Sequence, residues 1–129
     1  MYNNLWYQSL NKSALTPPGY VFSVAWTILY ILMAISVFLY IKGGINKEKT
    51  FALWVFGIQL ILNLLWSPIF FGLHNVYLAF GIILLLLILV LWVIVLFHKT
   101  SKTAAYLLVP YFLWLIFAAY LNFEIIRLN

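Results

Sequence analysis

The chain has 129 residues, of which 67% are hydrophobic and only 7% are charged. A water-soluble domain carries about 25% charged residues, because its core must be covered by a wetted surface. The sequence has too little charge for such a surface, which excludes a soluble globular fold and indicates one embedded in a lipid bilayer. Cysteine is absent, so disulfides, thiolate metal sites and a catalytic thiol are excluded as well.

Four apolar runs, each about as long as a membrane is thick, follow a polar and aromatic N-terminal segment. They cover residues 20–41, 51–71, 76–97 and 106–126. About 21 residues at 1.5 Å per residue span the roughly 30 Å of hydrocarbon, and the alternating polarity expected of membrane strands is missing. Residues 20–129 are therefore expected to form an all-α integral membrane bundle of four helices, antiparallel because the connections are short.

Lysine and arginine predict the orientation of this bundle. Residues 42–50 and 98–103 hold five of the seven basic side chains, and the opposite side holds only Lys12 and Arg127. Basic loops stay on the cytoplasmic side, so both loops are expected in the cytoplasm and both chain termini outside. This distribution also explains the net charge of +5 without a nucleic-acid partner, which is not expected.

The third apolar run differs from the others in having almost no polar residues. Residues 82–96 are nearly all Leu, Ile and Val, with Trp92 as the exception. Such a helix is expected to face lipid along much of its circumference.

Polar and aromatic side chains recur on one face of each of the other three helices. The second helix carries Gln59, Asn63, Trp66 and Phe70; the last carries Tyr111, Trp114, Ala118 and Asn122; the first carries Ser23, Trp26 or Thr27, and Tyr30. Spacings of three and four residues place each set on one face, and buried amides need partners, so these faces should point into the bundle. Pro68 is expected to kink or end the second helix.

Two interpretations of these stripes stay open. The amides could hold the helices together, at about 0.6 kcal/mol per hydrogen bond. Alternatively, the stripes could line a cavity for a large, flat, mostly apolar ligand held by a few hydrogen bonds.

No catalytic or metal-binding constellation is recognisable. The two acids are Glu48, in a loop, and Glu124, which can pair with Arg127 three residues later. A proton-coupled exporter would need an acid in mid-membrane. His74 and His98 fall in loops on opposite sides, so no metal site is expected. A weak pattern proposed for cholesterol contact occurs at Val37–Lys42.

Taken in order, these residues resemble the tryptophan-rich sensory protein and translocator protein family, also called the peripheral benzodiazepine receptor family. The matching residues are Trp6-Tyr7, Leu10, Lys12, Thr16-Pro17-Pro18-Gly19, Phe22, Ala25-Trp26-Thr27-Ile28-Leu29-Tyr30, Gln59, Asn63, Trp66-Ser67-Pro68-Ile69-Phe70-Phe71-Gly72, Pro110-Tyr111-Phe112-Leu113-Trp114, Phe117-Ala118 and Leu121-Asn122. They run in family order from Trp6 to the C-terminus, and the ordered set is highly specific although no single tripeptide is.

The resemblance implies a membrane receptor or sensor that binds porphyrins, haem precursors or sterols between its helices and requires no cofactor. The ligand-binding residues expected from it and from the stripes are Trp26, Tyr30, Gln59, Asn63, Trp66, Phe70, Tyr111, Trp114, Ala118 and Asn122. Residues 1–19 would form an amphipathic cap over the pocket, with Trp6, Tyr7, Pro17 and Pro18 as its contacts.

The resemblance leaves the activity itself open. Some family members degrade protoporphyrin in light through pocket tryptophans, so Trp26 and Trp114 are the candidate catalytic residues. The resemblance is also compatible with a porphyrin or sterol transporter, and the helix stripes with a regulatory subunit that acts by helix contacts without any ligand. The family resemblance also implies that two copies of the chain associate as a homodimer.

The sequence departs from the family pattern in two places. Family members have five helices and their Trp-Tyr segment follows the first, whereas Trp6 here follows Met1 almost directly. The chain is therefore expected to lack the first helix, either as a natural four-helix variant or through a lost start. The cap reads Lys12-Ser13-Ala14-Leu15 and lacks the usual proline and aromatic residue, which predicts a looser cap and weaker ligand retention.

Overall fold

The fold was obtained as a computed structural model, which describes residues 6, 9, 10 and 19–129. Within these ranges the structure is helical and contains no strand: α2 (Gly19–Ile41), α3 (Lys47–Ser67), the π-helical turn η1 (Pro68–Gly72), α4 (Val76–His98), α5 (Lys102–Leu107) and α6 (Val109–Leu128). Four segments are long and apolar enough to cross a membrane, namely α2, α3 with η1, α4, and α5 with α6. The predicted all-α bundle of four spans is confirmed.

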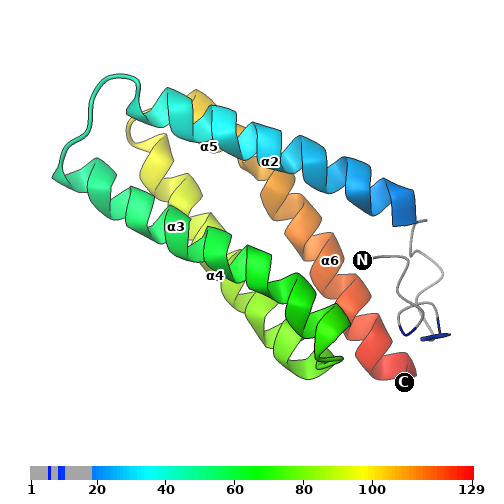
Figure 1. Ribbon diagram of the computed structural model, residues 1–129. Coiled ribbons are helices and arrows are strands. Elements are labelled where there is room, and N and C mark those ends of the chain that lie inside the picture. The colour runs from blue at the N-terminus through cyan, green and yellow to red at the C-terminus, as the bar shows by residue number, and fades with distance from the viewer. Residues whose placement is uncertain (1–5, 7–8, 11–18) are drawn as a thin grey trace.

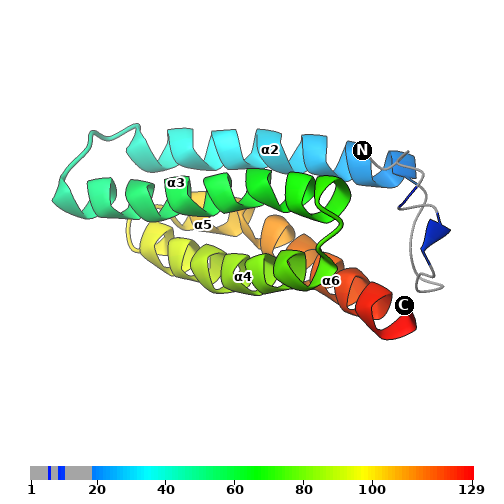
Figure 2. The ribbon, with the colours of Figure 1, turned by 60° about the horizontal axis from the view of Figure 1, so that its bottom comes forward.

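The four spans run antiparallel. The beginning of α2 and the end of α6 lie at the same end of the bundle, and the loop between α2 and α3 lies at the other (Figure 1, Figure 2). We call these the cap end and the loop end.

The second span begins four residues earlier than predicted. The side chain of Asn46 accepts a hydrogen bond from the backbone N–H of Lys49 at 2.9 Å and so caps the first turn of α3, where Glu48 also suits the helix dipole. Lys47 and Lys49, expected in a loop over residues 42–50, therefore lie on the helix. Lys49 Nζ donates to the carbonyl oxygen of Gly44 at 2.9 Å, which draws the short remaining loop back onto α3.

The second basic loop is also shorter than the predicted range 98–103. α4 continues through His98, and Ser101 begins α5 by accepting a hydrogen bond from the N–H of Ala104 at 3.2 Å. Only residues 99–101 connect the two helices. The capping side chains Asn46 and Ser101 explain why both helices start before the apolar runs do.

Pro68 ends the α-helical part of the second span, as predicted, but not the span itself. The chain widens into η1, in which the N–H of Leu73 donates to the carbonyl oxygen of Pro68 at 3.0 Å. The wider turn places two adjacent rings, Phe70 and Phe71, inside the bundle at 2% and 5% exposure.

The fourth span consists of two helices, whereas a single run from residue 106 was expected. It begins with α5 at Lys102 and breaks at Leu108, two residues before Pro110. Proline has no N–H and its ring collides with the carbonyl four residues earlier, so it is accommodated in the first turn of α6. Near the other end of α6, Glu124 and Arg127 form the predicted ion pair.

α4 packs against both α3 and α6 and is the central helix of the bundle. Its inward residues repeat at spacings of four and three: Ala79, Ile83, Leu86, Val90, Val93 and Phe97. Other faces of α4 expose apolar side chains such as Ile88 and Trp92, in line with the expected lipid contact. The same helix therefore borders lipid and forms the spine of the core.

α2 approaches the rest of the bundle closely only along α5. Ala104 and Ala105 of α5 are fully buried, and Ser36 Oγ of α2 donates to the carbonyl oxygen of Ala104 at 2.7 Å. Small residues allow two membrane helices to approach each other in this way. Toward the cap end α2 and α6 diverge (Figure 1), and aromatic side chains occupy the space between them.

The inward face of α2 contains Trp26 and not Thr27, which resolves a choice that the sequence left open. Thr27 is exposed and its hydroxyl donates to the carbonyl oxygen of Ser23 at 2.8 Å. Ser23 is exposed too, so its assignment to the inward stripe was wrong. Phe22 takes the position one turn before Trp26, because an aromatic ring fills the wide interhelical space and a serine cannot.

Candidate ligand-binding site between the helices

A chain of hydrogen bonds links α2, α3 and α6 near the middle of the bundle. The Tyr30 hydroxyl donates to Asn63 Oδ1, and Asn63 Nδ2 donates to the Tyr111 hydroxyl oxygen at 2.8 Å. The Tyr111 hydroxyl in turn donates to Gln59 Oε1 at 2.8 Å. Gln59, Asn63 and Tyr111 are all buried, where neither water nor lipid can pair with them. Each of these hydrogen bonds therefore satisfies polar groups that would otherwise be left unpaired at a cost in free energy.

A cavity lies beside this chain, toward the cap end, between α2, α3, α4 and α6. Its walls are formed by Phe22, Trp26, Asn63, Trp66, Phe70, Phe71, Ile83, Leu86, Trp114, Leu115, Ala118, Leu121, Asn122 and Ile125. None of these side chains carries a charge. The free volume is about 30 Å³, much less than the roughly 300–1,000 Å³ of typical small-molecule sites.

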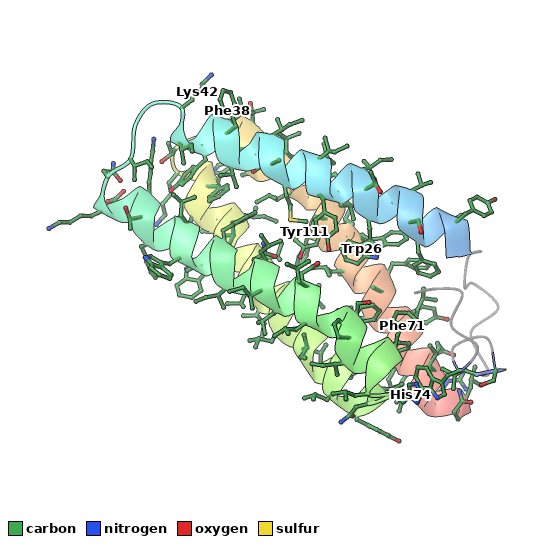
Figure 3. All side chains as sticks on the ribbon, in the orientation of Figure 1. Trp26, Phe38, Lys42, Phe71, His74 and Tyr111 are labelled. Carbon is green, nitrogen blue, oxygen red and sulfur yellow. The ribbon has the colours of Figure 1, made fainter. Side chains whose placement is uncertain are left out.

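Aromatic rings occupy most of the space between α2 and α6. Trp26 meets Trp114 edge to face with ring centroids 6.3 Å apart, and it contacts Tyr111 in the same way at 6.3 Å. Phe22 meets Trp114 at 5.8 Å. Figure 3 shows Trp26 and Tyr111 projecting into the space between the two helices.

A second aromatic group closes the α3 side of the cavity. Trp66 stacks on Phe70 at 5.1 Å, and Phe70 contacts Phe71 edge-on at 4.8 Å. Trp66 Nε1 donates to Asn122 Oδ1 at 3.4 Å, while Asn122 Nδ2 donates to the carbonyl oxygen of Val76 at 3.1 Å. Asn122 thus bonds α6 to the end of α3 and to the first residue of α4.

Two buried N–H groups have no hydrogen-bond acceptor among the described residues. They are Nε1 of Trp114, on the cavity wall, and Nε2 of Gln59, at the end of the polar chain. A buried donor without an acceptor costs about 1–3 kcal/mol. A ligand with a carbonyl or carboxylate oxygen in the cavity would offset this cost at Trp114. The site offers rings and donors for binding, and its walls contain no acid, base or nucleophile for catalysis by proton or group transfer.

The structure places seven of the ten residues predicted to bind ligand on the cavity wall: Trp26, Asn63, Trp66, Phe70, Trp114, Ala118 and Asn122. The other three, Tyr30, Gln59 and Tyr111, lie in the polar chain that ties the helices together. The two amides of the stripe therefore differ in position. Gln59 joins helices, whereas Asn63 both joins helices and lines the cavity.

Sequence reasoning missed the aliphatic part of the wall. Ile83 and Leu86 come from α4, which was interpreted as a lipid-facing helix without a role in the site. Leu115, Leu121 and Ile125 extend the wall along α6. Aliphatic residues in a membrane helix look alike whether they face lipid or a cavity, so the sequence contained no signal that distinguishes them.

Of the predicted cap residues, Trp6 is described, and Tyr7, Pro17 and Pro18 lie outside the described residues. Trp6 packs edge-on against Phe70 at 5.5 Å and stacks face to face on His74 at 4.1 Å. His74 belongs to the turn between η1 and α4 and has a φ of +55°, a left-handed conformation that costs energy in a residue other than glycine. The strained turn presents its ring to Trp6 beside the cavity.

We expect His74→Asn to loosen Trp6 while preserving the turn. Asparagine tolerates a left-handed conformation better than most residues but has no ring to stack on the indole. The fluorescence component of Trp6, obtained by subtracting the spectrum of Trp6→Phe, should shift to longer wavelength and become about twofold more accessible to acrylamide. Unchanged accessibility would show that stacking on His74 does not hold Trp6 in place.

The fold and the site define a class of multi-pass helical membrane protein with an aromatic cavity inside the bundle. The chain belongs to the TspO/MBR family, whose model matches residues 1–128. This confirms the family suggested by the sequence.

Individual relatives align over most of the chain. A tryptophan-rich protein TspO of Chlorobaculum tepidum is 40% identical over 125 residues, covering 96% of this chain and 79% of the relative. A tryptophan-rich sensory protein of Cereibacter sphaeroides is 36% identical, with coverages of 96% and 77%. A translocator protein of Ovis aries is 37% identical, with coverages of 92% and 72%.

Proposed function

We propose that this protein is a membrane receptor or sensor that binds a porphyrin in the cavity between α2 and α6. The observation that carries the proposal is the cavity wall itself: two facing tryptophans and a set of phenylalanines, with the unpaired Nε1 of Trp114 among them. Flat aromatic macrocycles stack on such rings, and porphyrin carboxylates can accept from an indole N–H. The names of the relatives, which describe a sensory protein and a translocator protein, support a sensor or receptor role.

The small free volume defines how binding must proceed. A porphyrin cannot enter about 30 Å³, so the rings that fill the space have to move apart. α2 is the element suited to this movement, because its close backbone contact lies at α5 and its cap end is separated by side chains. In the bound state Trp26 and Trp114 would stack on the ligand and give up their edge-to-face contact with each other.

The weak cholesterol pattern at the end of α2 does not support a sterol on the outer surface of that helix, because its tyrosine, Tyr40, is turned into the bundle. This residue belongs to the cholesterol pattern at Val37–Lys42, yet it is 2% exposed and stacks on Phe97 inside the bundle at 3.9 Å. The Tyr40 ring therefore does not lie on the outer surface of α2, which a sterol bound through this pattern would contact.

Titration with protoporphyrin IX tests the proposal. In detergent or nanodiscs the porphyrin absorbance should change with saturation, and Trp26→Phe, Trp114→Phe or Asn63→Ala should each weaken binding about three- to tenfold, the equivalent of one or two lost contacts. Trp54→Phe is the matched control, because Trp54 is 70% exposed on the outer face of α3. Uptake that never saturates and is the same in the triple variant would contradict a receptor and favour a subunit without ligand.

The same samples distinguish a receptor from an enzyme. The edge-to-face contact between Trp26 and Trp114 is the feature that favours light-driven porphyrin degradation as a second candidate. Under illumination in air, an enzyme should consume porphyrin faster than free tryptophan does, and Trp26→Phe or Trp114→Phe should abolish the excess. A receptor should consume porphyrin no faster than the free amino acid does.

A further inference from the structure

A second cavity opens at the loop end of the bundle, between the first turn of α3 and the end of α4. It has a volume of about 390 Å³ and is lined by Tyr40, Lys47, Glu48, Phe51, Leu96, Lys99 and Thr100. It shares no wall residue with the aromatic cavity near the cap end. Its size falls within the range of small-molecule sites without any rearrangement.

The charged side chains around this cavity divide into those on its wall and those elsewhere at the same end. Lys47 and Lys99 are on the wall, and the side chain of neither makes a hydrogen bond or ion pair with any residue the structure describes. Lys49 is occupied by its bond to the carbonyl oxygen of Gly44. Glu48 is the one acidic residue on the wall, so two cations face one anion.

The N-terminus of α3 adds to the positive potential of the cavity. Lys47 and Glu48 are the first two residues of this helix, and Lys99 follows directly after the last residue of α4. The unpaired N–H groups of a helix N-terminus favour an anion, and here they act beside two lysine side chains.

An apolar surface continues from the cavity toward the middle of the membrane. Phe51 is on the cavity wall, is 44% exposed and meets Trp92 edge-on at 5.5 Å. Trp92, the one aromatic interruption of the aliphatic α4 run, is also 44% exposed. Cations above an exposed aromatic pair match the two chemical parts of an anionic phospholipid, a phosphate head and acyl chains.

We propose that this cavity binds the headgroup of an anionic phospholipid, with the phosphate between Lys47 and Lys99 and an acyl chain along Phe51 and Trp92. A membrane lipid is the occupant, rather than a soluble anion, because the wall continues directly into the lipid-exposed surface of α3 and α4. The site is separate from the porphyrin proposal and does not depend on it.

Brominated lipids provide the test, because bromine quenches tryptophan only on close contact. The protein is placed in bilayers that mix phosphatidylcholine with phosphatidylglycerol, and one lipid at a time carries brominated chains. The Trp92 component is the difference between the spectra of the native chain and Trp92→Phe. Each lysine near an anionic phosphate strengthens association about fivefold, which gives about 25-fold for two lysines. Glu48 on the wall offsets part of this, so phosphatidylglycerol should be enriched beside Trp92 by about tenfold.

Two double variants with equal charge separate a site from general surface attraction. Lys47→Gln/Lys99→Gln should bring the enrichment close to one. Lys42→Gln/Lys102→Gln removes the same charge from the same end, outside the cavity wall, and should change it less than twofold. Lys42 projects away from the bundle (Figure 3), which suits it as the control. Equal losses in the two double variants would overturn the proposal.

A third variant changes binding in the opposite direction and so does not depend on a loss of structure. Glu48→Gln removes the only acid from the wall and should raise the enrichment about two- to fivefold. Failure to rise would count against the site even if the lysine variants do not fold. Inorganic phosphate, added at constant ionic strength, should leave the enrichment unchanged; displacement of the lipid by phosphate would identify a soluble anion as the occupant instead.

Discussion

Ala104→Leu is expected to lower the free energy of unfolding by about 3 kcal/mol, because it forces α2 away from α5. Ala104 has no exposed surface, and its carbonyl oxygen accepts the hydrogen bond from Ser36. A leucine side chain at this fully buried position has no free space to occupy. The close backbone approach of α2 to the bundle lies at α5, so displacement at this position disturbs the main helix–helix contact that α2 makes.

Equilibrium unfolding in mixed detergent micelles, followed by circular dichroism, measures this effect. Thr103→Leu is the matched control: it places the same leucine side chain at an exposed neighbouring position and should change stability by less than about 0.5 kcal/mol. Equal stability of the two variants would show that α2 is held by its aromatic contacts and not by α5.

Tyr111→Phe is expected to cost about 2 kcal/mol while leaving the aromatic packing in place. The phenylalanine ring keeps the contact with Trp26, but Asn63 Nδ2 loses its acceptor and Gln59 Oε1 loses its donor. Both groups are buried and neither can turn to water. Tyr106→Phe removes a hydroxyl from a tyrosine that is 59% exposed and should have almost no effect.

A second substitution distinguishes a lost hydrogen bond from a disturbed core. Gln59→Leu in the Tyr111→Phe background replaces the orphaned amide by an apolar side chain of similar size. Removing both partners of a buried bond is much less costly than removing one, so the double variant should recover about half of the lost stability. A further decrease would mean that Gln59 stabilises the bundle through its volume and not through Tyr111.

The contacts of α2 along its length indicate where a ligand could enter the bundle. The Ser36–Ala104 contact holds α2 near the loop end, and Tyr30 joins it to Asn63 near the middle. Beyond Tyr30, toward the cap end, α2 meets the bundle through rings such as Phe22 and Trp26. Rings can change rotamer without breaking backbone contacts, so this third of α2 is the part of the bundle best suited to open.

Much of the membrane architecture could be read from the sequence. Charge-poor runs of about 21 residues predict helical spans, since an unpaired backbone is too costly in lipid. Spacings of three and four placed Asn63, Trp66 and Trp114 on inward faces, because a polar or large aromatic group stands out against aliphatic residues. The helix starts were less predictable, since Asn46 and Ser101 cap helices through side-chain bonds that hydropathy does not register.

What the sequence determined by itself was the class of fold, the four spans and the helix faces that carry polar and aromatic residues, all of which depend on local composition and period. Only the tertiary structure decided which polar residues pair with each other and which line the cavity, because Gln59 and Asn63 share a face and differ only in what lies opposite. It also decided that α4 contributes Ile83 and Leu86 to the site. An aliphatic side chain is equally stable against lipid or against another helix, and only the packing of α3 and α6 around α4 distinguishes the two.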